Sequence, residues 1–263
     1  MNWRAVGCLG VSAVGFVGVL LALLLAFTFV GAGEIEDQQP LPNGGVVLRD
    51  GYVSVYLLPL AGGGYALVDT GNDDSGAVID RALLARGAVR DDVKAILLTH
   101  AHPDHVAACA GFEDADIDVM RDELPLLYGE VAPKGPLPRM FGAHSSPCPR
   151  SQVVPVEDGA VVTLAPGVTA RAFAVPGHTA GSAAWYVDGV LFLGDAADAD
   201  RDGRLTTAKW LFSDHQRQAT RSLVSLAERV RATQLPVQAM AFSHSGTIAG
   251  GEPLQAFAAS RVR

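Results

Sequence analysis

The sequence predicts an α/β fold made of two halves, in which two sheets pack together and helices lie on the outside. One observation is the order of the elements: strands, a helix, a strand and a helix, followed by a second series of strands, helix, strand and helix. Another is composition, because 49% hydrophobic residues in a 263-residue chain are enough for a large core. The sequence also shows no short repeat period, which argues against a repeat architecture.

The first half opens with three short β-prone runs. Turn-forming Asp-Gly and Gly-Gly-Gly sequences separate them, a pattern that predicts an antiparallel meander. The runs are Val46–Leu48, Tyr52–Leu60 and Tyr65–Val68. Further on, the spacing of apolar residues between positions 77 and 84 predicts a helix, and the apolar run Val93–Leu98 predicts a buried strand.

The remaining elements continue the same alternation. A long helix is predicted from Thr207 to about Arg231, because its apolar residues recur at helical spacing. Further strands are predicted at Ile117–Met120, Val168–Val175, Ala183–Val187, Val190–Leu193 and Gln238–Phe242. The stretch from Glu113 to Gln152 is rich in proline and the least regular. Two interpretations stay open for it: a surface excursion that joins the halves, or a lid over a substrate site.

The first 33 residues differ from the rest. Residues 5–33 carry no charge, and a helix of this length exceeds the ~30 Å hydrocarbon core of a bilayer. We therefore predict one N-terminal transmembrane helix that anchors the chain in a membrane. The alternatives are a signal peptide cleaved near Ala32, which would leave a secreted or periplasmic protein, and a buried globular helix. Arg4 precedes the segment and acidic residues follow it, so the positive-inside rule places the rest outside the cytoplasm.

The chain after the anchor divides into a linker and a domain. Residues 34–45 are acidic and then rich in Pro and Gly, which predicts a linker, and the globular domain spans residues 46–263. From residue 34 onward, nineteen Lys and Arg stand against twenty-eight Asp and Glu, a net charge of −9. This balance argues against a nucleic-acid partner. The predicted partners are a small-molecule substrate and the membrane, and the oligomeric state is left open.

Two of the three cysteines, Cys109 and Cys148, lie in the predicted domain. An exported location permits a disulfide between them. The sequence leaves open whether they approach each other.

Candidate metal ligands concentrate at predicted strand ends. The sequence Thr-His-Ala-His-Pro-Asp-His at positions 99–105 directly follows a buried strand, and histidines two residues apart in an extended chain share one side. Single candidates follow three later strands, namely His178, Asp195 and His244. Imidazole nitrogens and carboxylates without thiolates suit Zn²⁺, although Fe and Mn fit the same ligand types. His144 and His215 lack such a setting and are interpreted as surface or lid residues.

The order of these motifs resembles that of the metallo-β-lactamase superfamily of hydrolases. The similarity extends from about Val46 to the end of the chain. It rests on Val-Asp-Thr-Gly at 68–71, the His-rich motif, Pro-Gly-His-Thr at 176–179, Gly-Asp at 194–195 and Ser-His-Ser-Gly at 243–246. The resemblance implies a four-layer αβ/βα sandwich with a metal site between its two sheets.

The resemblance also implies a role for each candidate residue. His100, His102 and His178 would hold one metal, and Asp104, His105 and His244 would hold the second. Asp195 would bridge the two metals, and Asp69 would support the metal loop without binding a metal. Two Zn²⁺ per chain are therefore expected. The chemistry expected of such a pair is activation of a bound water, with Asp104 as the candidate catalytic residue that takes up or relays its proton.

The bridging position also guides the prediction of substrate. True β-lactamases of this superfamily carry Cys or Ser there, so Asp195 favours cleavage of esters, lactones, thioesters or phosphodiesters. Glyoxalase II has a long C-terminal helical region for glutathione, whereas only nineteen residues follow His244 here. We predict a dinuclear metal-dependent hydrolase of a small ester, lactone or thioester. The alternatives are a non-catalytic metal-binding or sensor domain at the membrane, a phosphodiesterase, a β-lactamase and an iron-dependent oxygenase.

A weaker pattern concerns calcium. Asp198, Asp200 and Asp202 alternate as in the first half of a calcium-binding loop, but the twelfth position carries Lys209. The two interpretations are a Ca²⁺ site completed by another loop and a solvated acidic turn.

Overall fold

The computed structural model describes residues 18, 23–24, 26 and 28–261. Contacts divide the chain into two units, residues 1–32 and residues 33–263. Within the described residues, no helix combines the length and the apolar character needed to cross a bilayer. Most of the predicted membrane segment, residues 5–33, lies outside the described residues.

The first sheet of the larger unit has six strands in the order of the sequence. The strands are β1 (Val46–Asp50), β2 (Val53–Pro59), β3 (Tyr65–Val68), β4 (Val93–Leu97), β5 (Asp116–Met120) and β6 (Val153–Val156). The first three form the predicted antiparallel meander, and β3 to β6 run parallel to one another. The carboxyl ends of these parallel strands therefore meet at one edge.

The second sheet also has six strands, in the order β14-β13-β10-β9-β8-β7. Their bounds are β7 (Val161–Ala165), β8 (Val168–Ala174), β9 (Ala183–Val187), β10 (Val190–Gly194), β13 (Ala239–Phe242) and β14 (Gly246–Ala249). All pairs are antiparallel except β10 with β13. The strands β8, β10 and β13 therefore share one direction, and their carboxyl ends lie at one edge.

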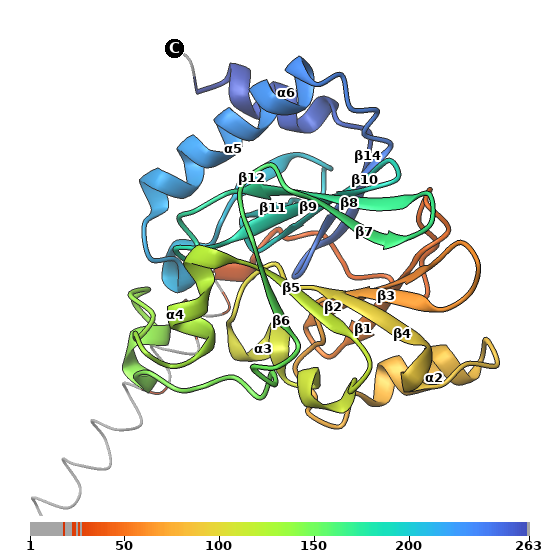
Figure 1. The fold of residues 1–263 in the computed structure, drawn as a ribbon. Helices are drawn as coiled ribbons and strands as arrows, with labels where there is room; N and C mark the ends of the chain where they lie inside the picture. The colour runs from red at the N-terminus through yellow and green to blue at the C-terminus, as the bar shows by residue number, and fades with distance from the viewer. Residues whose placement is uncertain (1–17, 19–22, 25, 27, 262–263) are drawn as a thin grey trace, which may run out of the picture. The chain divides into compact units, whose positions relative to one another are not determined.

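The helices cover the outer faces of the two sheets (Figure 1). The α-helices are α2 (Ala77–Leu84), α3 (Pro103–Val106), α4 (Leu124–Leu127), α5 (Gln216–Ala232) and α6 (Glu252–Ala259). Short 3₁₀ turns are η1 (Arg90–Asp92), η2 (Cys109–Gly111), η3 (Arg121–Glu123), η4 (Pro138–Phe141) and η5 (Trp210–Phe212). A two-stranded ribbon joins β11 (Ala197–Ala199) to β12 (Leu205–Thr207).

Three apolar clusters correspond to the interfaces between four layers. One lies between the sheets and holds residues such as Val47, Trp185 and Phe192. A second lies between the first sheet and α2, where Ile79 and Leu83 are buried. The third lies between the second sheet and helices α5 and α6. The predicted arrangement of two packed sheets with helices outside is confirmed.

Several predicted boundaries differ from the structure. The long helix begins at Gln216, not Thr207, because residues 205–207 form β12 and residues 210–212 form a 3₁₀ turn. Residues 34–45, predicted as a linker, pack against the domain through Ile35 and Leu41 in the core between the sheets. The two apolar side chains of this segment fix it to the core, although its Pro and Gly content predicted a linker. Strands β6, β7, β11, β12 and β14 are additional.

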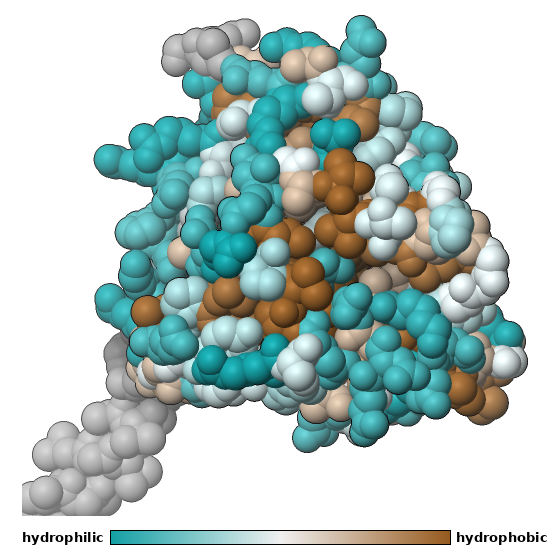
Figure 2. Space-filling view, in the orientation of Figure 1, coloured by the Kyte–Doolittle hydropathy of each residue, from teal (hydrophilic) through white to brown (hydrophobic). Residues whose placement is uncertain are grey.

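The core between the sheets reaches the surface at one side of the sandwich. There β6 and β7 form the free edges of the two sheets. Partly buried apolar residues of β7 and β8, including Val162 and Val168, pack against the core at this edge. In the view of Figure 2, apolar side chains gather near the middle of the visible face of the domain.

Strand β5 places one carboxyl group toward the core between the sheets. Ile117 and Val119 belong to the outer cluster, whereas Met120 belongs to the core, so alternation turns Asp118 inward with Met120. Asp118 is 3% exposed. Burial, together with the charge of Asp116, raises the pKa of Asp118 to about 7.

We expect the stability of Asp118→Asn, measured relative to that of the wild-type domain, to be higher at pH 8 than at pH 5. Because the folded pKa is above the unfolded value, the wild-type domain binds an extra proton between about pH 4 and 7 and loses stability as pH rises through this window. The free energy of unfolding of the variant relative to wild type should rise by about 2–3 kcal/mol from pH 5 to pH 8. Urea unfolding at both pH values measures it, with the exposed Asp114→Asn as control. If the free energy of unfolding depended on pH equally in Asp118→Asn and wild type, burial would not raise the pKa of Asp118 as stated.

Candidate metal centre

The predicted ligands meet at one end of the sandwich, where strands of both sheets finish. His100 and His102 follow β4, and Asp104 and His105 lie in the short helix α3. From the second sheet, the ligands that follow strands β8, β10 and β13 are His178, Asp195 and His244. Sheet topology therefore brings together residues up to 144 positions apart in the sequence.

Three imidazoles form the first group of ligands. His178 Nε2 lies 3.1 Å from His100 Nε2 and 3.0 Å from His102 Nδ1. All three side chains are buried. The three nitrogen atoms therefore surround one point, as ligands of a single ion do.

Hydrogen bonds on the opposite ring nitrogens orient two of these imidazoles. Thr99 Oγ1 donates to Asp69, so it accepts from His100 Nδ1 at 3.1 Å. Ser213 Oγ donates to the Lys209 carbonyl, so it accepts from His178 Nδ1 at 3.2 Å. Each ring therefore carries its proton on Nδ1 and turns a bare Nε2 lone pair toward the other.

This arrangement fits a metal ion. Two nitrogen lone pairs that face each other at 3.1 Å repel unless a cation lies between them. In a tetrahedral zinc site, Zn–N bonds of about 2.0–2.1 Å place ligand nitrogens about 3.3 Å apart. Burial, reinforced by the neighbouring histidines, holds the pKa of both His100 and His178 well below the ordinary value, so both rings are neutral and ready to bind a metal.

Asp104, His105 and His244 form the second group. His105 Nε2 lies 3.8 Å from Asp104 Oδ1, and His244 Nε2 lies 3.6 Å from Asp104 Oδ2. His244 Nδ1 donates to the Tyr52 carbonyl at 2.9 Å, and the Tyr52 ring stacks on the imidazole. The ligand atoms of this group lie within 4.8 Å of one another.

Asp195 lies between the two groups. Its Oδ2 is 3.5 Å from His178 Nε2 of the first group and 3.2 Å from His244 Nε2 of the second. Its Oδ1 is 3.5 Å from His105 Nε2, and within the described part of the chain both of these buried atoms lack a hydrogen-bond partner. A carboxylate placed in this way can bridge two metal ions and satisfy both orphaned atoms.

The protonation of the second group differs from that of the first. Burial lowers the pKa of His105, but the charges of Asp104, Asp195 and Asp69 outweigh it and raise the value to about 9. Burial likewise opposes protonation of His244. The negative charge of Asp195 and a hydrogen bond to Asp195 outweigh burial and raise the pKa of His244 to about 10. In the absence of metal, two protonated rings therefore balance the carboxylates, and metal binding must displace these protons.

Asp69 supports the ligands without facing the metal positions. Its Oδ1 accepts from the Thr99 backbone N–H at 2.8 Å, and its Oδ2 accepts from Thr99 Oγ1 at 2.7 Å. The same Oδ2 accepts from His105 Nδ1 at 2.8 Å, which leaves His105 Nε2 for a metal. The supporting role that the resemblance implies for Asp69 stays a prediction, and these hydrogen bonds are the contacts through which it would act.

The remaining residues that the sequence analysis considered do not join these two groups among the described residues. His144 and His215 are exposed, and His215 precedes helix α5. The aspartates considered for calcium have other partners: Asp198 contacts Lys209 and Ser245, Asp200 accepts from two backbone N–H groups of its turn, and Asp202 pairs with Arg204. They are not among the groups of described residues that could hold a metal, and Asp198 is buried whereas Asp202 is exposed.

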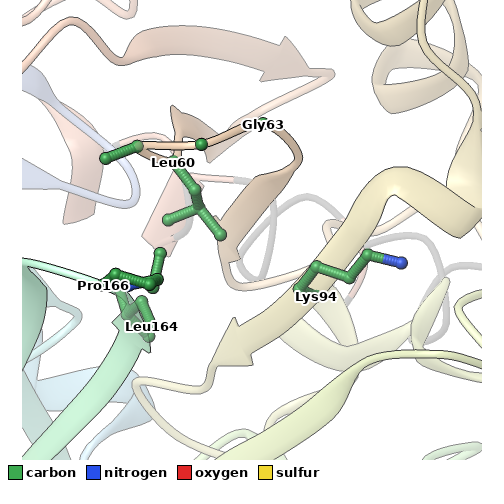
Figure 3. A pocket seen from close by; sticks show the side chains of 8 residues that line it. Leu60, Gly63, Lys94, Leu164 and Pro166 are labelled. Carbon is green, nitrogen blue, oxygen red and sulfur yellow. The ribbon is translucent and has the colours of Figure 1, made fainter.

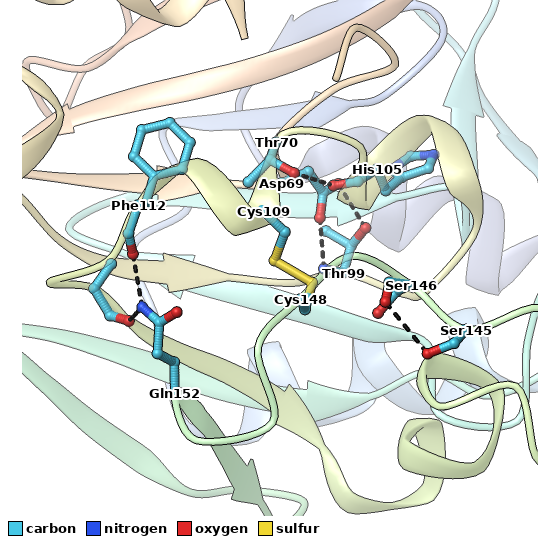
Figure 4. Close-up of a disulfide and its surroundings, with 11 residues drawn as sticks. Asp69, Thr70, Thr99, His105, Cys109, Phe112, Ser145, Ser146, Cys148 and Gln152 are labelled. Atoms are coloured by element: carbon cyan, nitrogen blue, oxygen red, sulfur yellow. Dashed lines mark hydrogen bonds and ion pairs between the residues drawn. A yellow bond between two sulfur atoms is a disulfide. The ribbon is translucent and has the colours of Figure 1, made fainter. Parts of the chain in front are cut away.

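The proline-rich segment is fixed beside the metal centre by a disulfide (Figure 4). Cys109 follows α3, which carries two ligands, and bonds to Cys148 with Cα atoms 4.9 Å apart. Elsewhere in the segment, Lys134 and Gly135 donate backbone N–H groups to Asp214 at 2.7 and 3.0 Å. The segment is thus tied to both halves of the domain, and the choice between a surface excursion and a lid stays open.

Apart from Asp69, sequence reasoning missed the groups that orient the candidate ligands. Ser213 and the Tyr52 carbonyl bind ligand rings, and Glu123 is a fully buried acid beside the ligand loops. Each lies far in sequence from the ligands it serves, and isolated Ser, Tyr and Glu residues give no motif.

A pocket of about 410 Å³ lies at the opposite end of the strands (Figure 3). The β2–β3 turn, the start of β4 and the β7–β8 turn line it, with Leu60, Leu164 and Pro166 as its apolar walls. Lys94 is the one ionisable group among its lining residues, and its amine donates to the Asp91 carbonyl. The pocket therefore offers no constellation comparable to that at the metal centre.

Comparison with known proteins gives consistent matches. The profile of a family described as the metallo-beta-lactamase superfamily matches residues 48–244. A hydroxyacylglutathione hydrolase of Cupriavidus taiwanensis is 34% identical over 146 residues, which cover 53% of this chain and 47% of that protein. One of Yersinia pestis is 35% identical over 130 residues, covering 48% and 43%. The chain thus matches about half the length of these relatives.

Solved structures agree in fold. A metallo-beta-lactamase family protein from Thermus thermophilus has a TM-score of 0.60 and 27% identity, with 84% of this chain and 80% of that chain covered. A B3 metallo-beta-lactamase with an active-site glutamic acid has a TM-score of 0.64 and 20% identity, with 87% and 88% covered. The latter likeness concerns the fold alone.

We expect Asp69→Asn to weaken metal binding at the second group by about 10–100-fold. An amide in place of the carboxylate cannot accept from Thr99 and His105 with both of its terminal atoms, so His105 loses its fixed orientation. Zinc titration of the metal-free chain against a chromogenic chelator measures the change. The exposed Asp74→Asn serves as the control. Two sites of wild-type affinity in Asp69→Asn would show that His105 is oriented by other contacts.

Proposed function

Because the chain belongs to the metallo-β-lactamase superfamily, we propose that it is a dinuclear metal-dependent hydrolase of a small ester, lactone or thioester. The observation that carries the proposal is the position of Asp195, whose two oxygens face one group of three imidazoles and a second group of two imidazoles and a carboxylate. Seven ligands exceed what one tetrahedral ion can use. The proposed metals are two Zn²⁺.

The residues of the site divide the work of hydrolysis. When bound, two zinc ions supply a water of lowered pKa and polarise the carbonyl under attack. His100, His102 and His178 would hold one ion as neutral nitrogen donors. Asp104 is partly exposed, with 20% of its side chain accessible, and can take up or relay the proton of the attacking water. No nucleophilic side chain is required, so no acyl-enzyme should accumulate.

A thioester stands first among the proposed substrates. The curated relatives that the chain matches are named hydroxyacylglutathione hydrolases, and their matched part is about half their length. We take the proline-rich segment as the cover of the site, in which Met140 and Phe141, each 74% exposed on η4, would contact an apolar acyl group. The turn η5, which carries the exposed Trp210, is adjacent, since the Leu137 N–H donates to the Leu211 carbonyl at 3.0 Å.

Substrate preference is measured by kcat/KM on one zinc-loaded preparation. We expect thioesters, lactones and activated esters to turn over faster than β-lactams and phosphodiesters. His102→Ala, which removes a ligand, should lower both metal content and turnover. We propose that Phe141 contacts the substrate as part of the lid, so Phe141→Ala should change KM while leaving metal content unchanged, because Phe141 is not a proposed ligand. Phosphodiester turnover well above that of the acyl substrates would overturn the assignment, and so would retention of full activity in His102→Ala.

We further propose that the domain is extracytoplasmic and held at a membrane by residues 5–33. The charges that flank this segment support the orientation. The Cys109–Cys148 disulfide supports an oxidising compartment, because thiols are kept reduced in the cytosol.

A reporter fused after Arg263 tests this location. We expect an enzyme that requires export, such as a periplasmic phosphatase, to be active in the fusion. The fusion should remain with the membrane fraction after carbonate washing. Activity of a cytoplasm-restricted reporter would contradict the proposed topology, and release of the fusion into the soluble exported fraction would favour cleavage near Ala32.

A further inference from the structure

Glu123 is a carboxylic acid buried at the root of the proline-rich segment. It ends the 3₁₀ turn η3, directly before α4, and its side chain is fully buried. Burial raises the pKa of Glu123 to about 7, although three donated hydrogen bonds lower it. A buried acid of this kind is costly unless its oxygens are well satisfied.

The two oxygens of Glu123 join the two loops that supply the first group of ligands. Oε1 accepts from the Ala101 backbone N–H at 2.8 Å. Oε2 accepts from Thr179 Oγ1 and from the Gly181 backbone N–H, both at 2.8 Å. Ala101 stands between His100 and His102, and Thr179 follows His178.

The contact between Gly181 and Glu123 leaves no room for a side chain at position 181. A Cβ atom at Gly181 would lie 2.2 Å from the Glu123 backbone nitrogen, so a side chain there would push the loop away. Thr179 is also held within its own loop, because its N–H donates to Ser182 Oγ at 2.9 Å. The loop after β8 is therefore fixed against Glu123 through backbone and side chain together.

We propose that Glu123 is a positioning residue that sets the distance between the His100–His102 pair and His178, and thereby the metal affinity of the first group. The inference rests on the proposed metal site. Ligand nitrogens 3.0–3.1 Å apart from two different sheets need a fixed spacing between their loops. The Glu123 carboxylate supplies this fixed spacing, because it accepts hydrogen bonds from both loops and does not face the metal position.

The experiment compares Glu123→Gln with wild type as metal-free full chains. The Gln side chain has the same shape but one acceptor oxygen, so its NH₂ group must face at least one of the N–H groups of Ala101 and Gly181. Zinc titration against a chelator should show a 10–100-fold weaker first-group site. The Co²⁺ absorption spectrum should also change, because it reports coordination geometry. Glu130→Gln, an exposed acid of the same segment, is the matched control and should titrate as wild type.

Melting temperatures separate positioning from a general role in folding. If Glu123 positions the ligands, the increase in Tm caused by zinc is smaller in Glu123→Gln than in wild type. If the Tm of the metal-free chain falls and the zinc-induced increase is unchanged, the proposal is wrong. Thr179→Val is the second variant, because it removes one donor to Glu123 and preserves shape; it should weaken the first-group site roughly tenfold.

The outcomes also distinguish this inference from the proposed function. A wild-type chain that binds no zinc refutes the metal site itself. A wild-type chain that binds two zinc ions, with Glu123→Gln equal to it in affinity and spectrum, refutes only the role of Glu123. If metal-free Glu123→Gln does not fold, wild-type affinity in Thr179→Val overturns the proposal and weakened affinity supports it.

Discussion

The carboxylate of Asp69 is the interaction on which the metal centre depends. It accepts from the backbone and side chain of Thr99 and from the His105 ring. Through Thr99 Oγ1 the same network reaches His100, so one carboxylate orients ligands of both groups. Asp69 itself has φ 59°, a left-handed conformation that costs a non-glycine residue about 1 kcal/mol or more. The backbone turn at the end of β3 is therefore strained where it aims this carboxylate at the ligands.

Charge is distributed unequally across the site. The first group presents three imidazoles whose pKa values burial lowers, whereas the second contains a carboxylate and two imidazoles of raised pKa. The acid that lies between the groups, Asp195, has its pKa held well below the ordinary value by His244 and His105 despite its burial. Two cations would take over the role that the two ring protons play in the metal-free protein.

The sequence predicted which candidate ligands lie together more completely than it predicted the groups around them. Strand ends marked by His and Asp were sufficient to bring His100, His178 and Asp195 to one place, because topology fixes where the strands of each sheet finish. The helix predicted from Thr207 began too early, since apolar residues of a ribbon and a 3₁₀ turn mimic helical spacing. The role of Glu123 could not be predicted, because it depends on hydrogen bonds from the Ala101 and Gly181 backbone N–H groups. These residues are distant in sequence and approach Glu123 only when the chain folds.

The Cys109–Cys148 bond has a consequence for the covalent integrity of the chain. It closes a loop of 39 positions that contains the exposed residues of η4. Exposed loop tips are where proteases cut first. A single cut between the two cysteines leaves both fragments joined by the disulfide, with the His-rich motif on one piece and His178 on the other. Outside a cell, a nicked molecule would thus still carry every ligand, and only reduction would separate the two pieces.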